Sequence, residues 1–194
     1  DSILYKASDI KLLIPQVAEA GDIVPTSSTT VQLALGDALA IASMNYRKFD
    51  KLDFKKFHPA GNLAKKLKTA SDIMLIGNKI PFVNENITMK QALKKLNSKR
   101  QGFLVVTNNQ ELTVGVFTDG DLKRLMQKKS IINNLTIKNF ITKNPFSVKA
   151  NVLATDILKQ MNKKKITNVC VYNGKNKRKT IGIIHIHNLI NLIK

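Results

Sequence analysis

The sequence is poor in residues that several kinds of site and architecture require. Its 194 residues include one cysteine, Cys170, which excludes an internal disulfide framework and a cysteine-based zinc cluster. No stretch approaches the roughly eighteen uninterrupted apolar residues of a membrane span. The N-terminus lacks the basic start, apolar run and small-residue cleavage site of a signal peptide. These absences argue against membrane insertion and secretion and favour a cytoplasmic protein.

Acidic and aromatic residues are also scarce. Lysine and arginine number 32 against 13 aspartates and glutamates, which gives a formal net charge of +19. Such an excess usually indicates nucleic-acid binding, because cations that neutralise phosphates release counterions. Only four of the 32 are arginines, however, and aromatic residues make up 6% of the chain with no tryptophan. Few groups are therefore available for bidentate base contacts or base stacking, and the charge indicates a solvated lysine-rich surface instead.

What the sequence does contain is a globular composition and an internal repeat. With 43% apolar and 23% charged residues, the chain can fold as one ordinary domain or two to three small ones. Residues 87–97 align with residues 152–162 at a shift of 65. Each copy reads as helix, buried strand, polar turn, second strand and final helix. Two copies, each too small to bury both faces of its sheet, are expected to pack on each other.

The residues before the repeat read as the end of a larger α/β domain. Residues 10–14 have the pattern of a buried strand, and the chain has no initiator methionine, so we expect a fragment. A hydroxyl-rich segment at 25–30 precedes a predicted helix from Val31 to about Arg47. Apolar residues lie on nearly all sides of this helix, which predicts that it is buried in a core or a subunit interface. The hydroxyls and free amides at its start also suit a phosphate.

The second strand of the first copy continues into GVFTDGD at 115–121. In this segment a glycine is followed by two apolar residues, then a threonine and, three positions later, an aspartate. At this repeat length the segment resembles the CBS domain, a regulatory module that binds adenosine-type nucleotides and usually occurs as a pair. The resemblance implies that Thr118 and Asp121 face a ligand's phosphate and ribose hydroxyls. A hydroxyl beside helix N-terminal amides suits an oxyanion, and a carboxylate accepts two hydrogen bonds from a vicinal diol.

In the second copy the corresponding segment is GIIHIHN at 182–188. His185 and Asn188 stand at the threonine and aspartate positions, so we expect an altered nucleotide site there. His185 and His187 would share one face of a strand and could bind zinc, but no third ligand is near them in the sequence. We therefore expect no metal site.

Four motifs upstream occur in one order: PTSSTT at 25–30, LGDALA at 35–40, FHPAGNL at 57–63 and SDIM at 71–74. In this order and spacing they resemble the arabinose-5-phosphate isomerases, in which a sugar-isomerase (SIS) domain precedes a CBS pair. The resemblance implies that residues 1–69 are the C-terminal end of a flavodoxin-like, parallel-sheet SIS domain. Residues 70–130 and 131–194 would then be two α+β CBS modules packed as a pair.

That family interconverts D-ribulose 5-phosphate and D-arabinose 5-phosphate for Kdo, a sugar of lipopolysaccharide and some capsules. The reaction passes a proton between neighbouring carbons through an enediol, which needs an acid–base group and a phosphate anchor but no cofactor. The resemblance implies that His58 and Glu19 are catalytic. The substrate-binding residues it implies are Thr26, Ser27, Ser28 and Thr29.

Each of these residues also has a simpler interpretation: His58 as a turn residue, Glu19 as an exposed helix-end glutamate, and the hydroxyls as helix caps. The family's lysine and a further glutamate fall outside this sequence. We therefore expect residues 1–194 alone to be inactive as an isomerase.

The resemblance implies two kinds of ligand, a sugar phosphate and a regulatory nucleotide or nucleotide-sugar, for which AMP, ATP, CMP and CMP-Kdo are the candidates. It also implies a homodimer or homotetramer, and the composition predicts no specific nucleic acid and no membrane as partner. The alternative is a non-enzymatic CBS-pair nucleotide sensor in which the SIS remnant serves only for oligomerisation. The gene sequence upstream of Asp1 would separate the two.

Overall fold

The structure is a computed structural model that describes residues 2–58, 60–128 and 131–193. Pro59, part of the predicted turn after His58, lies outside the described residues. The chain divides into two units, Asp1–Phe57 and His58–Lys194, and each is described by itself.

The first unit contains helices α1 (Ile3–Ala7), α2 (Ser27–Tyr46) and α3 (Lys51–Phe57). The strand expected at 10–14 does not form, and Ile10 and Leu13 are 81% and 82% exposed. A buried strand needs neighbouring strands to bond its amides and carbonyls. In the described part of this unit the only β pairing is the isolated bridge between Ala20 and Val24, so that requirement is unmet.

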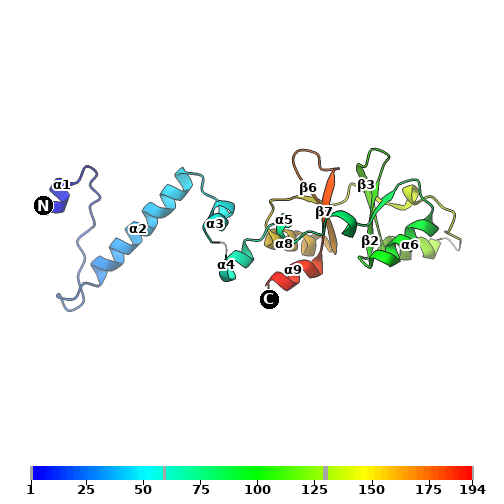
Figure 1. Cartoon of the computed structure of the whole chain (residues 1–194). Coiled ribbons are helices and arrows are strands. Elements are labelled where there is room, and N and C mark those ends of the chain that lie inside the picture. Colours follow the sequence, from blue (N-terminus) through cyan, green and yellow to red (C-terminus); the bar gives the residue numbers. More distant parts are fainter. Residues whose placement is uncertain (1, 59, 129–130, 194) are drawn as a thin grey trace. The chain divides into compact units, whose positions relative to one another are not determined.

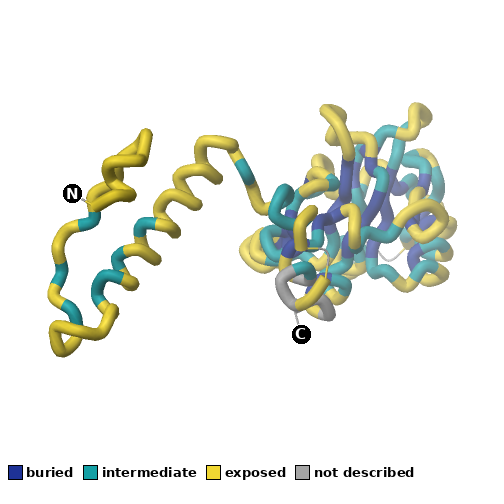
Figure 2. Tube along the Cα trace, turned by 60° about the vertical axis from the view of Figure 1, so that its left-hand side comes forward, coloured by how far each residue is buried: buried dark blue, intermediate teal, exposed yellow. Residues whose placement is uncertain are grey.

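Helix α2 starts four residues before the predicted Val31, because Ser27 to Thr30 are already helical. None of its residues is buried, and Leu33 and Ile41 are 68% and 55% exposed. Figure 2 shows exposed and half-buried colours along the whole helix. The burial predicted for this helix is therefore not found in the described residues of this unit. No helix in the described ranges is both long and apolar enough to cross a membrane.

The second unit carries the repeat (Figure 1). After α4 (Gly61–Lys66), α5 (Ala70–Ile73) and the 3-10 turn η1 (Gly77–Lys79), the first copy is β1 (Phe82–Asn84), α6 (Met89–Lys99), β2 (Phe103–Thr107), β3 (Thr113–Thr118) and α7 (Asp119–Lys128). The linking segment holds η2 (Ile137–Phe140) and β4 (Thr142–Lys143). The second copy is β5 (Ser147–Lys149), α8 (Ala154–Lys164), β6 (Asn168–Tyr172), β7 (Thr180–His185) and α9 (Ile186–Ile193).

The two sheets confirm the repeat in detail. In each copy the first strand is parallel to the second, and the second is antiparallel to the third; β4 extends the first sheet beside β3. The register shifts after Val106 in β2 and after Val171 in β6, at equivalent positions. The helices α6 and α8 both end at a residue in the left-handed region, Arg100 and Lys165.

The segment that precedes each copy completes the core of the other copy. Ala70, fully buried, packs in the core of the second copy, and its amide donates to the Val152 carbonyl at 2.8 Å. Leu75 exchanges backbone hydrogen bonds with Ile183 of β7 at 2.8 and 3.0 Å. Conversely, Ile137 is fully buried in the core of the first copy, and its amide donates to the Ile87 carbonyl at 3.1 Å. The two copies therefore form one interlocked body.

A third cluster joins the sheets directly. It consists of Ile80, Phe103, Val105, Cys170 and Ile183. Burial raises the pKa of the Cys170 thiol to about 12, so this cysteine is a core residue, as its apolar neighbours in the sequence indicate. The buried hydroxyls of Thr113 and Thr180 also bond across the copies at 2.7 Å.

The close approach of β4 to β3 predicts the effect of adding a side chain at Gly115. A Cβ at this position would lie 2.8 Å from the backbone carbonyl oxygen of Thr142, and this backbone atom cannot rotate away. We expect Gly115→Ala to lower the free energy of unfolding by about 1–3 kcal/mol, as overpacking does. The matched control is Gly120→Ala in α7, where a Cβ would meet only ordinary contacts at 3.6 Å and should be neutral or stabilising. Denaturant unfolding of both variants tests this, and equal stabilities would contradict it.

Candidate functional site

A cleft of about 540 Å³ lies between the two copies. It is lined by the carboxyl ends of β3 and β7, the amino ends of β2 and β6, the start of α7 and the segment after β4. Its apolar lining includes Phe103, Val116, Pro145, Phe146 and Ile166, and its charged lining is Asp119, Asp121, Arg124 and Lys165. An apolar surface beside a few fixed polar groups is typical of a small-molecule site.

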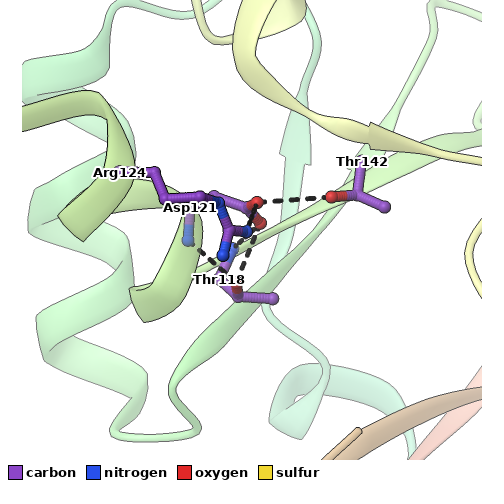
Figure 3. Close-up of polar contacts among 4 residues, drawn as sticks. All are labelled: Thr118, Asp121, Arg124 and Thr142. Atoms are coloured by element: carbon purple, nitrogen blue, oxygen red, sulfur yellow. Dashed lines mark hydrogen bonds and ion pairs between the residues drawn. The ribbon is translucent and has the colours of Figure 1, made fainter. Parts of the chain in front are cut away.

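Thr118 and Asp121, both predicted from the sequence, line this cleft together (Figure 3). Thr118 ends β3, and its amide and hydroxyl donate to Oδ2 of Asp121 at 2.9 and 2.8 Å. The Asp121 amide donates back to the Thr118 hydroxyl oxygen at 3.1 Å. These reciprocal bonds form a capping box, which explains why the two residues are three apart at the start of α7.

The other oxygen of this carboxylate binds two residues that sequence reasoning missed. Oδ1 of Asp121 accepts from the guanidinium of Arg124 and, at 3.3 Å, from the hydroxyl of Thr142. The Asp121 side chain is 10% exposed and that of Arg124 is 68% exposed. The i, i+3 spacing of Asp121 and Arg124 on a helix could have indicated this ion pair, whereas Thr142 comes from the linking segment.

In the second copy His185 and Asn188 form a partial version of this cap. The His185 amide donates to Oδ1 of Asn188 at 3.2 Å, and Nδ1 of His185 accepts from the His187 amide at 3.2 Å. His185 lines the cleft with the first copy's residues, but Asn188 does not. In the described ranges no group of three histidine, cysteine, aspartate or glutamate side chains is arranged to hold a metal ion.

Of the predicted isomerase residues, Glu19 and the hydroxyl side chains lie in the first unit. Oε2 of Glu19 accepts from the amides of Thr26 and Ser27 at 2.7 and 2.9 Å, and Oε1 accepts from the Ser28 amide at 3.2 Å. Hydrogen bonding by the Ser28 side chain, followed by the Thr26 amide, lowers the pKa of Glu19 to about 2. Glu19 therefore caps α2 as a charged carboxylate.

The hydroxyls beside Glu19 also have capping partners. The Thr26 hydroxyl accepts from the Ala20 amide at 3.0 Å, and the Thr29 hydroxyl donates to the Thr26 carbonyl at 2.8 Å. His58 is exposed at the start of the second unit. Catalytic and sugar-phosphate roles for these residues stay predictions.

A second cleft, of about 580 Å³, lies at the amino end of β3. Its lining includes Lys138, Lys143 and Arg178, with Glu85 paired to Lys138 at 3.1 Å. It contains none of the threonine–aspartate motif, so the cleft around Asp121 is the candidate site.

A model of the CBS domain family matches residues 70–128 and 137–194, which together are more than half of the chain. The chain belongs to the CBS domain family. The matched ranges contain both copies of the repeat, so the cleft lies between two CBS domains.

Curated relatives confirm the resemblance to the arabinose 5-phosphate isomerases. The chain is 37% identical over 193 residues to arabinose 5-phosphate isomerase KdsD of Yersinia pestis, and 34% identical over 193 residues to that of Escherichia coli K12. The match covers 98% of this chain and 58% of each relative, so the chain spans little more than half the length of those enzymes.

Solved structures confirm the CBS-pair fold. The CBS domain of a bacterial CNNM/CorC family Mg²⁺ transporter in complex with ATP matches with a TM-score of 0.56 at 19% identity, covering 68% of this chain and 90% of that one. CBSX2 in complex with AMP matches with a TM-score of 0.53 at 22% identity, covering 63% of this chain and 93% of that one. At these identities the likeness concerns the fold alone.

The cap of the second CBS domain predicts a dependence on pH. Burial, followed by the neighbouring His187, lowers the pKa of His185 from its ordinary value of 6.5. The unfolded chain therefore binds this proton more tightly than the folded chain, and stability falls as pH drops below about 6.5. His185→Thr restores the first domain's capping residue without a titrating group. Melting temperatures from pH 7.5 to 5.5 should fall less in this variant, and parallel curves would contradict the assignment.

Proposed function

We propose that the cleft between the CBS domains binds a nucleotide or nucleotide-sugar and that this chain is the regulatory part of an arabinose 5-phosphate isomerase. The observation that carries the ligand assignment is the Thr118–Asp121 pair. It lies in one cleft with two cationic side chains, Arg124 and Lys165, and an apolar lining. Asp121 provides a carboxylate that a ribose diol can bind by replacing donors that it now accepts from. Arg124 and Lys165 attract a phosphate, and Phe146 with Pro145 offers a surface for a base.

Two groups of similar proteins suggest candidate ligands. CBS structures of the same fold hold AMP and ATP, which supports an adenine nucleotide. The resemblance to the isomerases supports CMP or CMP-Kdo. CMP-Kdo would be the activated sugar at the end of the pathway, and an end product can regulate an earlier enzyme. A ligand that prefers one arrangement of the CBS pair shifts the enzyme's conformational equilibrium by its difference in affinity.

In the isomerase as a whole, residues 1–69 would form the end of the SIS domain and residues 70–130 and 131–194 the CBS modules. Its substrates would be D-ribulose 5-phosphate and D-arabinose 5-phosphate, for Kdo and lipopolysaccharide synthesis in the cytoplasm. His58 and Glu19 would move the proton, and Thr26 to Thr29 would bind the substrate. A pKa of about 2 makes Glu19 a poor base while it caps α2, so it acts only after leaving those amides.

The exposed apolar helix α2 supports this assignment, because Leu33, Leu39 and Ile41 are each about half or more exposed. In the proposed isomerase they are covered by the rest of the SIS domain or by a second subunit of a homodimer or homotetramer.

A non-enzymatic CBS-pair sensor is the second candidate. It is favoured by one observation: both CBS domains that form the cleft lie within this chain. An upstream gene sequence without a phosphate-binding loop, lysine and glutamate would support this sensor over the isomerase.

Ligand binding is tested by thermal shift with AMP, ATP, CMP and CMP-Kdo. A ligand that binds only the folded chain raises its melting temperature, and at a hundred times its Kd it adds about 2.7 kcal/mol. Asp121→Asn should abolish the shift.

The matched control is Asp72→Asn, which removes a carboxylate from the equivalent capping box with Thr69 outside the cleft. This variant should lose comparable stability and keep the shift. No shift with any of the four compounds would overturn the nucleotide assignment.

Isomerase activity is tested on the chain itself. Because the family's lysine and second glutamate are absent from this sequence, ketose formation from arabinose 5-phosphate should stay at background with residues 1–194 alone. A rate above background would show that these 194 residues contain a complete active site.

A further inference from the structure

The carboxylate of Asp121 has no acceptor position left for a ligand. A carboxylate offers about four such positions. Asp121 receives the amide and hydroxyl of Thr118 on Oδ2, and the Arg124 guanidinium and Thr142 hydroxyl on Oδ1. A ribose diol that needs two hydrogen bonds from this carboxylate must therefore displace two of its present donors.

The two oxygens differ in how easily they release their donors. The bonds to Oδ2 belong to the capping box of α7, and one of them comes from the Thr118 backbone, so they persist while the helix persists. The bonds to Oδ1 come from two side chains, one of which, Arg124, is 68% exposed. A side chain can rotate away from Oδ1 without unwinding the helix, so Oδ1 is the oxygen that a diol can take.

Displacement leaves the Arg124 guanidinium at the rim of the same cleft without its carboxylate. A guanidinium binds phosphate as well as carboxylate, with bidentate geometry. A nucleotide thus supplies both the diol that releases Arg124 and the phosphate that binds it afterwards, whereas a nucleoside supplies only the diol.

We propose that Arg124 is a specificity-determining residue that exchanges Asp121 for the ligand's phosphate and so restricts the cleft to phosphate-bearing ligands. This inference rests on the proposed nucleotide site. In the free chain Arg124 occupies the ribose-binding oxygen, and in the bound chain it holds the phosphate.

The test compares AMP with adenosine by isothermal titration calorimetry on the wild-type chain and on Arg124→Gln. The variant removes the phosphate partner and, at the same time, one of the two donors to Oδ1. AMP should bind about tenfold more weakly, since charge-assisted bonds to a phosphate are strong. Adenosine should bind about two- to fivefold more tightly, because the Arg124 guanidinium no longer competes with its diol for Oδ1. If AMP does not bind, CMP and cytidine replace the pair of probes.

Lys123→Gln is the matched control, since it removes the same charge from the neighbouring position of α7 without touching the cleft lining. It should leave the preference for AMP over adenosine unchanged.

A second variant, Thr142→Val, removes the other donor to Oδ1 and should tighten the binding of both ligands equally. An unchanged AMP-to-adenosine preference in Arg124→Gln, with AMP still bound, overturns the partner exchange alone. Failure of AMP and CMP to bind the wild-type chain overturns the nucleotide site and this inference with it.

Discussion

The exchange of leading segments between the two CBS domains is the constraint on which the rest of the structure depends. Ala70 fills the core of the second domain and Ile137 fills the core of the first, so neither domain has a complete core by itself. Because each segment also bonds to the backbone of the other domain, the sheets are held in a fixed relation. The cleft exists only in that relation, since both domains contribute to its lining.

Within this frame one short motif has two roles. The hydrogen bonds by which Thr118 and Asp121 start α7 also fix the direction of a carboxylate in the cleft. A side chain held by the helix it caps loses little conformational freedom when a ligand arrives, which is the advantage of a preorganised site. The second domain also has a cap at His185, in which Nδ1 accepts from the His187 amide, although its residues differ from those of the first domain.

The sequence was informative where a residue's partners are close along the chain. The repeat follows from local pattern, and the pairing of Thr118 with Asp121 follows from a short motif that resembles the CBS domain. Arg124 was missed although its helical spacing was visible, because ion pairing competes with simple solvation of an exposed arginine. Thr142 and the exchange of leading segments join residues far apart in sequence, which periodicity does not reveal. The strand expected at 10–14 and the burial expected of α2 need neighbouring elements that the described part of the first unit does not supply.

The single cysteine makes the opening of this CBS pair measurable by thiol labelling. Cys170 lies in the cluster between the sheets, 1% exposed, and burial holds its pKa near 12. A thiol attacks an alkylating agent as the thiolate, so burial slows this reaction in the folded chain. The labelling rate of Cys170 therefore reports how readily the cluster between the sheets becomes exposed, and no other thiol in the sequence contributes to the signal.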